Sequence, residues 1–260
     1  MRVLVTFAVD AEFEPWRKRH SFQRQELSVP HSYRSDAVYT GKVNEVVVDV
    51  YLTGVGWNGV RAGLYHLLSK KPHLCISSGL AGGLKPNLMS GQIVAGRKIV
   101  LLQGGAVVRA RERLLNIAEE VGATLVDCFI TSTQVVSQAQ FKKDMGVFGD
   151  VVEMESYHIL TMATGPQVAS IAIRAISDTV DEDLPLDFGK VLESDGRLNM
   201  RKLALQVGRY PHRIPALLKF GKRSERATEK LADFLDRYIE AVGSKSPHWF
   251  STEVAEVSAT

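Results

Sequence analysis

Nearly continuous apolar runs mark the strands that this sequence predicts. Residues 3–9 form a Val-rich run, which is typical of a strand buried on both faces of a parallel sheet. Two strand-like stretches follow within 37–53, and 45–52 is the stronger of them. Further short runs predict strands over residues 74–78, 92–102, 124–131, 151–152 and 168–176. The chain is therefore expected to build a sheet of mostly buried strands.

Between these runs, apolar residues recur at helical spacing. The pattern predicts helices over 57–70, 108–121, 138–146 and 155–164 and, beyond residue 197, over 200–208, 214–222 and 225–242. The polar stretch 17–35 has no period, and it predicts the end of a helix followed by a long loop. Strands that alternate with helices indicate a three-layer α/β/α sandwich with a mixed central sheet. We expect one domain over 1–243, with 184–243 as a helical extension, and a flexible tail over 244–260.

Composition and charge narrow the class of protein. With 260 residues, 45% of them hydrophobic and 23% charged, the chain is neither fibrous nor disordered. The net charge of +3 is too small to indicate nucleic-acid binding. Cys75 and Cys128 stand in apolar runs without a His at ligand spacing, so no metal is expected. Since no signal peptide and no apolar window of roughly 18 residues is found, we expect a cytoplasmic protein.

Two charged motifs carry the candidate chemistry. Val152-Glu153-Met154-Glu155-Ser156 is followed, nineteen residues after Glu155, by Arg174-Ala175-Ile176-Ser177-Asp178. Glu155 and Asp178 each stand where a buried strand meets a polar edge. Such a pair of carboxylates can hold a sugar hydroxyl and donate a proton. The chain is therefore predicted to be an enzyme.

Glycines follow two of the predicted strands, in 54–56 and in 79–83. Without a Cβ, a Gly lets the backbone approach a ligand closely. We therefore predict that the substrate contacts Gly56, Gly79, Leu80 and Ala81. The alternative is that these glycines only permit tight turns, and neither stretch fits the full dinucleotide-binding pattern.

The succession of these motifs is more specific than any one of them. Acidic residues after the first strand, the two glycine stretches, E-M-E-S and R-A-I-S-D occur in this order over residues 1–180. The order resembles that of the nucleoside phosphorylase and nucleosidase superfamily, especially the 5′-methylthioadenosine/S-adenosylhomocysteine nucleosidase branch. The resemblance implies cleavage of the N-glycosidic bond of a purine nucleoside with an adenosyl-type 5′ substituent. It also implies a homodimer or larger homo-oligomer and no metal or organic cofactor.

The resemblance assigns roles to individual residues. Glu12 would activate the attacking water, and Asp178 would protonate N7 of the leaving purine. Met154 would pack on the ribose, Glu155 would bind its hydroxyls with Glu153 beside it, and Ser177 would support Asp178 or the base. Val135 and Val136 would enclose the base, although this segment lacks the aromatic residue of adenine-specific nucleosidases, which leaves the identity of the base open. Chemistry agrees, because an oxocarbenium-like transition state needs carboxylates around the sugar.

Several alternatives remain open at this point. Asp10 and Glu14 compete with Glu12 for the role of the base, and Glu155 can instead be a core carboxylate paired with Arg174. Ser77 and Leu80 stand where related phosphorylases place an Arg and a Ser, which favours water over phosphate as nucleophile. Phosphorolysis, with phosphate as co-substrate, stays the alternative, because Arg61, Arg97 or Arg109 can supply the cation. A nucleoside-binding protein without catalysis is the second alternative.

The C-terminal extension carries a looser resemblance. The segments 195–199 and 210–218 look like the tail of hopanoid-associated phosphorylases, which act on an adenosyl group attached to a large lipid. We expect the tail to dock on the core through Ile214, Leu217, Leu218 and Phe220. Alternatively, Arg209, Arg213, Lys219, Lys222 and Arg223, within 209–223, surround an apolar stripe that contacts an anionic membrane.

Overall fold

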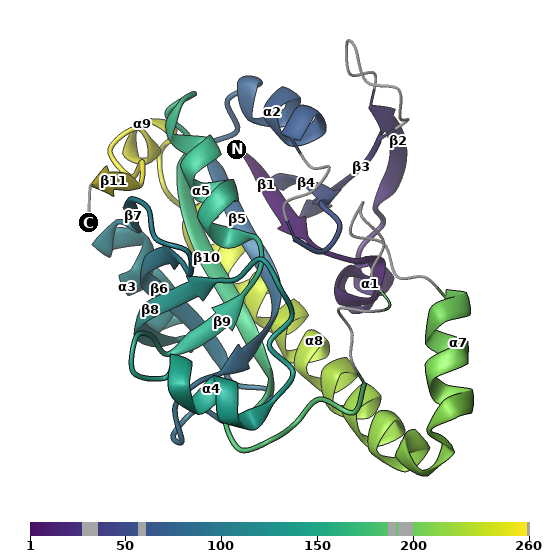
Figure 1. The fold of residues 1–260 in the computed structure, drawn as a ribbon. Helices are drawn as coiled ribbons and strands as arrows, with labels where there is room; N and C mark the ends of the chain where they lie inside the picture. Colours follow the sequence, from purple (N-terminus) through teal and green to yellow (C-terminus); the bar gives the residue numbers. More distant parts are fainter. Residues whose placement is uncertain (28–35, 57–60, 187–190, 192–199, 259–260) are drawn as a thin grey trace.

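A mixed sheet forms the centre of the molecule (Figure 1), as seen in a computed structural model that describes all residues except 28–35, 57–60, 187–190, 192–199 and 259–260. The strands lie in the order β11-β7-β6-β8-β9-β5-β1-β4-β3-β2, and β10 pairs with both β5 and β6. The strands are β1 (Arg2–Phe7), β2 (Gln23–Leu27), β3 (Asp36–Val43), β4 (Val46–Leu52), β5 (Leu74–Gly83), β6 (Ile93–Leu101), β7 (Val107–Arg109), β8 (Thr124–Thr131), β9 (Val151–Glu153), β10 (Ala169–Asp178) and β11 (Glu256–Ser258). The four central strands β4, β1, β5 and β10 are parallel to one another.

Helices cover both faces of the sheet. They are α1 (Asp10–Arg19), α2 (Arg61–Ser69), α3 (Glu112–Glu120), α4 (Ala139–Met145), α5 (Ser156–Thr164), α7 (Met200–Arg209), α8 (Ile214–Gly243) and α9 (Pro247–Phe250), with a 3-10 turn at Pro211–Arg213. In β1, Val3 and Val5 belong to the core that contains side chains of α1, α3 and α8, whereas Leu4 belongs to the core that contains those of α2 and α5. Alternate side chains of one strand thus enter two cores. The predicted three-layer sandwich with a mixed sheet is confirmed.

Most predicted elements are present, and the misplaced ones are those without a clear apolar pattern. The edge strand β2 lies in the stretch 17–35, where a loop was expected, because four of its five residues are exposed and its pairing with β3 is made by the backbone. The expected helix over 108–121 begins only at Glu112, since the short β7 precedes it. The glycines of 79–83 belong to β5 rather than to a turn after it.

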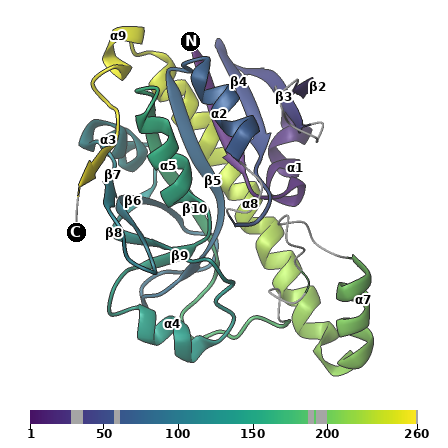
Figure 2. The ribbon, with the colours of Figure 1, turned by 45° about the horizontal axis from the view of Figure 1, so that its top comes forward.

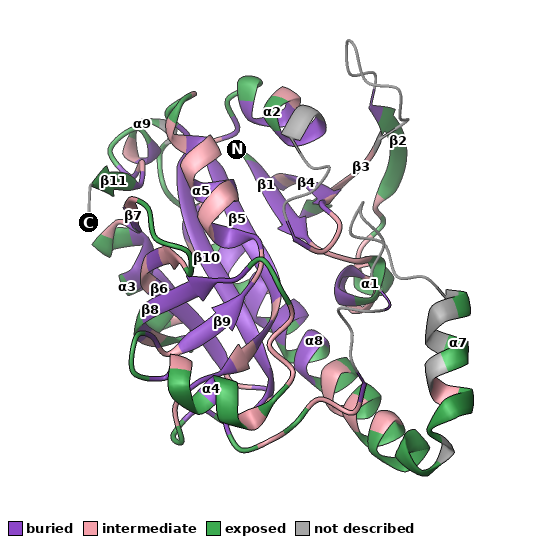
Figure 3. Cartoon of the chain, in the orientation of Figure 1, coloured by how far each residue is buried: buried purple, intermediate pink, exposed green. Residues whose placement is uncertain are grey.

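The C-terminal helices differ from the expected extension. Instead of two helices over 214–222 and 225–242, one helix of 30 residues runs from Ile214 to Gly243. Its second half buries residues such as Leu231 and Phe234 against the sheet, so this half is a layer of the fold. Its first half and α7 project from the body (Figure 2) and are mostly exposed (Figure 3).

Helix α7 and the first half of α8 together form an exposed arm, which corrects the expectation that this segment docks on the core. Ile214 is 38% exposed and Leu218 is 62% exposed, so these two residues do not dock the arm on the core. Within the described chain, none of the helices combines the length and the apolar character that crossing a membrane requires.

The end of the chain is docked rather than loose. Residues 247–250 form α9, whose Phe250 is buried in the core beside α8. Strand β11 then pairs antiparallel with β7, with Glu256 opposite Arg109. The expectation of a flexible tail over 244–260 is therefore wrong for its described residues. The buried apolar residues of this segment, such as Phe250 and Ala255, are few and are separated by polar residues. The sequence pattern therefore did not indicate a docked segment.

Candidate active site

A cavity of about 240 Å³ lies at the edge of the sheet where β5, β9 and β10 end. Parallel strands present their carboxyl ends at such an edge, where ligand sites of α/β sheets are found. Most residues predicted for the site line this cavity: Glu12, Leu80, Ala81, Val135, Val136, Glu153, Met154, Glu155, Ser177 and Asp178. Among the described residues that line it, none is a Lys or an Arg.

Glu12 is held at the cavity by backbone amides. Its Oε2 accepts hydrogen bonds from the N–H groups of Ala8 at 2.9 Å and Val9 at 3.4 Å, and its Oε1 accepts one from Leu80 at 2.8 Å. Burial raises the pKa of Glu12 above its ordinary value, although the bond from Leu80 and the charge of Arg174 partly offset this. A carboxylate offers about four lone-pair positions. One position on Oε1 therefore remains for a water molecule.

The neighbouring acidic residues point elsewhere. Asp10 forms an ion pair with Arg17 at 2.9 Å, and Glu14 forms one with Lys18 at 3.1 Å, with both carboxylates about half exposed. Of the three carboxylates at the start of α1, Glu12 is the buried one and the one that lines the cavity. The geometry thus favours Glu12 over Asp10 and Glu14.

Gly79 makes the position of Glu12 possible. A Cβ at this residue would lie 3.0 Å from both carboxylate oxygens of Glu12, and its φ of +141° disfavours any other residue. Gly56, at φ +75°, has a different use, since its N–H donates to Oε1 of Glu155 at 2.7 Å. Neither glycine lines the cavity, so both act on the carboxylates rather than on a ligand directly.

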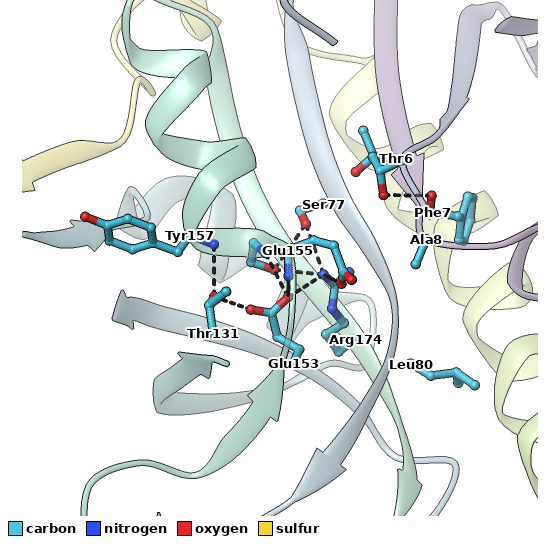
Figure 4. Close-up of polar contacts among 12 residues, drawn as sticks. Thr6, Phe7, Ala8, Ser77, Leu80, Thr131, Glu153, Glu155, Tyr157 and Arg174 are labelled. Atoms are coloured by element: carbon cyan, nitrogen blue, oxygen red, sulfur yellow. Dashed lines mark hydrogen bonds and ion pairs between the residues drawn. The ribbon is translucent and has the colours of Figure 1, made fainter. Parts of the chain in front are cut away.

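Glu153 and Arg174 form a buried ion pair beneath the cavity (Figure 4). Nη2 of Arg174 donates to Oε2 of Glu153 at 2.6 Å, to Ser156 Oγ at 3.0 Å and to Ser77 Oγ at 3.2 Å. Oε1 of Glu153 accepts from the hydroxyl of Thr131. Burial opposes the ionisation of Glu153, but Arg174 and this hydroxyl outweigh it and lower its pKa.

The same pair shapes the turn that carries Glu155. The backbone N–H groups of Glu155 and Ser156 donate to Oε2 of Glu153 at 3.0 and 2.8 Å. Thr131 in turn accepts the N–H of Tyr157 at 3.0 Å, which connects β8 to the start of α5 (Figure 4). Both oxygens of Glu153 are thus engaged by protein groups. Its position supports the site, although we predicted that it contacts substrate.

Glu155 is the more available carboxylate of this motif. One of its oxygens accepts the N–H of Gly56, and the other lies 3.6 Å from Arg174 Nη2. Burial and the charge of Glu153 raise the pKa of Glu155 to about 8, even though Arg174 opposes the shift. The alternative of a core carboxylate paired with Arg174 fits Glu153 better, because its contact is shorter. A protonated carboxyl group can accept a hydrogen bond from one hydroxyl of a diol and donate one to the other.

Asp178 ends β10 on the opposite side of the cavity. Its Oδ1 accepts from the hydroxyl of Ser177, and its Oδ2 forms an ion pair with Nζ of Lys142 on α4. Lys142 is fully buried. We did not predict this lysine, because Lys142 and Lys143 are adjacent in the sequence and nothing in the pattern shows which one turns inward.

Apart from Gln134, the rest of the described wall is apolar. Val135 and Val136 line the cavity as predicted, together with Met154. Phe220 joins them from α8, and it therefore faces the cavity rather than the docking contact expected of it. It supplies an aromatic side chain that we found missing in the segment 131–136.

Basic side chains proposed for a phosphate lie away from the cavity. Arg97 pairs with Glu112 at 2.9 Å on the surface, and Arg109 is exposed on β7. The side chain of Arg61 lies outside the described part of the chain. Within the described chain, the cations that reach the carboxylates of the cavity are Arg174, which is bonded to Glu153, and Lys142, which is paired with Asp178.

Comparisons with known proteins agree with this arrangement. The family model of the phosphorylase superfamily matches residues 2–207. A 5′-methylthioadenosine/S-adenosylhomocysteine nucleosidase of Maridesulfovibrio salexigens is 31% identical over 175 residues, covering 56% of this chain and 74% of that protein. The nucleosidase of the same name from Glaesserella parasuis is 29% identical over 182 residues, covering 60% of this chain and 78% of that protein.

Solved structures share the fold. The Campylobacter jejuni 5′-methylthioadenosine/S-adenosyl homocysteine nucleosidase superposes with a TM-score of 0.66 at 14% identity, covering 92% of this chain and 99% of that one. A futalosine hydrolase mutant of Helicobacter pylori gives a TM-score of 0.63 at 14% identity, with the same coverage. At this identity the likeness extends to the fold alone.

Proposed function

The chain belongs to the phosphorylase superfamily, and on this premise we propose that it hydrolyses the N-glycosidic bond of an adenosine-type purine nucleoside. The observation that carries the proposal is the set of three carboxylates, Glu12, Glu155 and Asp178, around one small cavity. Two of its relatives bear the name of a nucleosidase that acts on methylthioadenosine and S-adenosylhomocysteine. This is the chemistry that such a set of carboxylates supports.

In the proposed reaction, the ribose lies between Met154 and Glu155. Glu155 binds the ribose hydroxyls, and Glu12 takes a proton from a water molecule that attacks C1′. The raised pKa of Glu12 supports this role, because a stronger base removes the proton of water more readily. As C1′ gains positive charge, the surrounding carboxylates stabilise the oxocarbenium-like transition state.

At the other end, the bond between C1′ and N9 breaks and its electron pair stays on the purine. Asp178 donates a proton to N7, so that the base leaves as a neutral molecule. Val135, Val136 and Phe220 enclose the base through apolar contact. Hydroxide from the attacking water remains on C1′, and Glu12 holds the proton until it returns to solvent.

Water is favoured over phosphate by the charge of the cavity. A phosphate ion would enter a space lined by acidic side chains, and each of these that is ionised repels the ion at short distance. The lining residues that the structure describes include no basic side chain to hold it. Phosphorolysis remains the rival, and it requires a cation to enter the site in the complex.

A second cavity supports a substrate with a 5′ substituent. It has a volume of about 580 Å³ and shares Val9, Glu12, Leu80 and Phe220 with the first cavity. Its remaining walls come from α1 and α8 and include charged residues of both signs, among them Lys18 and Glu229. We expect 5′-substituted adenosines to have a higher kcat/KM than adenosine itself.

We further propose a homodimer in which an apolar patch near the cavity is covered. Phe141, Val147 and Phe148 at α4 are 56%, 79% and 73% exposed, and Leu102 lies at the same groove as Phe148. Large exposed apolar side chains mark sites of protein association. Sedimentation velocity is expected to give a dimer for the wild type and a monomer for Phe148→Asp, with Tyr65→Ser on α2 as control. A wild-type monomer at micromolar concentration contradicts this.

The test is release of free base from a panel of adenosine, methylthioadenosine, S-adenosylhomocysteine, inosine and futalosine, each with and without phosphate. Release without phosphate, with ribose as the product, supports the nucleosidase. Release that requires phosphate, with a ribose 1-phosphate as product, selects the phosphorylase. Tight binding without turnover of any nucleoside selects the binding protein.

A further inference from the structure

The proposed function leaves one buried charged residue near the reaction, Lys142, without a role. Its side chain has no exposed surface. The ammonium donates to Oδ2 of Asp178, to the carbonyl oxygen of Glu182 at 2.7 Å and to that of Thr179 at 3.1 Å. An ammonium has three donors, and all three are used. Lys142 does not line the cavity, so any effect on the reaction passes through Asp178.

Burying a lysine side chain in such a place costs folding free energy. Full burial of an ammonium requires a partner, and an apolar side chain of the same size would fill the space without this penalty. The next residue of α4, Lys143, shows the ordinary alternative. It is half exposed and pairs with the exposed Asp181 at 2.8 Å. The contrast indicates that the inward lysine serves Asp178.

The other charged groups near Asp178 are occupied elsewhere. The carboxylate of Glu182 accepts the N–H of Thr179 at 3.1 Å and pairs with Arg223. On α4, Asp144 accepts from Gln140 at 2.9 Å. Within the described chain, Lys142 is thus the cation whose charge meets Asp178.

Building on the proposed function, we propose that Lys142 is a positioning residue that fixes the Asp178 carboxyl toward the purine and supplies its proton. Two directional contacts, from Lys142 on Oδ2 and from Ser177 on Oδ1, leave the carboxyl little rotational freedom. As the bond to N9 breaks, the ammonium of Lys142 passes a proton to the Asp178 carboxylate, and Asp178 passes a proton on to N7. Lys142 is left as a neutral amine and regains its proton from solvent, while Glu12 releases the one it took from water.

The experiment compares Lys142→Gln with Lys143→Met, a control on the exposed neighbour. Gln keeps a donor for the two carbonyls but has neither the charge nor the transferable proton. With the best purine nucleoside of the panel, kcat of Lys142→Gln is expected to fall about 100-fold, the scale of general acid catalysis, while KM stays within about threefold. Lys143→Met is expected to match the wild type in both constants.

A second substrate separates proton supply from structure. In 4-nitrophenyl β-D-ribofuranoside the leaving group departs as a stable anion and needs no proton. Lys142→Gln and Asp178→Asn are expected to lose much less turnover on this substrate than on the purine nucleoside, whereas Glu12→Gln loses both reactions. Equal losses on the two substrates, or an unchanged kcat on the purine nucleoside, overturn the role of Lys142.

Two further comparisons keep the outcome decisive. If Lys142→Gln does not fold, the charge-free pair Lys142→Met/Asp178→Asn is compared with Asp178→Asn alone, and equal kcat values are expected because Lys142 acts only through Asp178. A further loss in the double variant contradicts this. If the wild type releases base from no nucleoside, the proposed function itself fails, and this result is distinct from any difference between the variants.

Discussion

The two ends of the cavity, at which we propose that the ribose and the base bind, hold buried carboxylates in different ways. At the ribose end, Glu12 and Glu155 are held by backbone N–H groups, and burial raises the pKa of both. At the base end, Asp178 meets the full charge of the buried Lys142. Backbone N–H groups are the nearest donors there, and Arg174 lies no closer than 3.6 Å to Glu155, so the two carboxylates stay basic, which suits removing a proton or binding hydroxyls. An ion pair keeps a transferable proton beside the carboxylate, which suits protonating a leaving group.

Replacing the proposed acid or the proposed base is expected to have the largest effect on activity. Asp178→Asn and Glu12→Gln are each expected to lower kcat on the purine nucleoside by about 10²–10⁴-fold, because each removes one proton transfer. Steady-state kinetics with purified protein provides the measurement. Asp181→Asn and Asp10→Asn change exposed carboxylates near each end and are expected to keep wild-type rates. Activity retained in either site variant would remove that residue from the mechanism.

Replacing Arg174 tests what lies beneath the ribose end. Arg174→Met leaves Glu153 buried without its cation, which is expected to lower the free energy of unfolding by about 3–5 kcal/mol. Urea denaturation followed by circular dichroism measures this. Arg97→Met removes an exposed pair with Glu112 and is expected to cost less than about 1 kcal/mol. Equal small losses in both would show that the buried pair contributes no more than a surface one.

Gly79→Ala sharpens the role of close packing at Glu12. The new Cβ would lie 3.0 Å from the carboxylate in a backbone of positive φ, so Glu12 must move or the strand must relax. We expect a loss of about 1–3 kcal/mol in stability and a fall in kcat. Gly104→Ala is the matched control, since its φ is +87° but nothing lies within 4 Å of its Cβ. Gly104→Ala has the same unfavourable positive φ but does not contact the active site. An equal fall in the kcat of this control would contradict a role for the contact with Glu12.

The apolar runs predicted the centre of this fold well, and the reason is physical. Strands such as β1 and β10 are buried on both faces, so their sequences carry an unbroken pattern. The edge strand β2 is held by backbone bonds to β3 and leaves no such pattern. The sequence predicted two helices in place of α8, with a break at Arg223 and Ser224. The exposed half of α8 has little pattern, because only its second half meets the sheet.

The site was predictable where residues are adjacent in sequence and hidden where they meet in space. Glu155 and Asp178 stand at strand ends that the pattern located. Phe220 lies on a helix far from the base-binding segment, and nothing local shows that it reaches the cavity. Lys142 differs from Lys143 only in which way α4 turns, and the contact with Asp178 joins residues 36 positions apart.

The last prediction concerns the pH dependence of stability at the proposed ribose end. The pKa of Glu155 is about 8 in the folded protein against an ordinary value of 4.5, so between these values the folded state holds a proton that the unfolded state has released. Stability from this group is complete below pH 4.5 and is lost as the pH rises through 8. In Glu155→Gln this dependence is absent, and its Tm relative to the wild type is expected to be higher at pH 9 than at pH 5.

Calorimetry at pH 5, 7 and 9 provides the measurement, with each kcal/mol corresponding to about 2–4 °C in a chain of this size. Glu14→Gln gives the baseline for losing an exposed carboxylate. Glu12 also has a raised pKa, and its charge contributes to the shift of Glu155, so the difference between the proteins contains Glu155 together with its coupling to Glu12. If the Tm difference is the same at all three pH values, Glu155 is ionised throughout. In that case an ionised Glu155 would bind the ribose hydroxyls, and it would only accept hydrogen bonds from them.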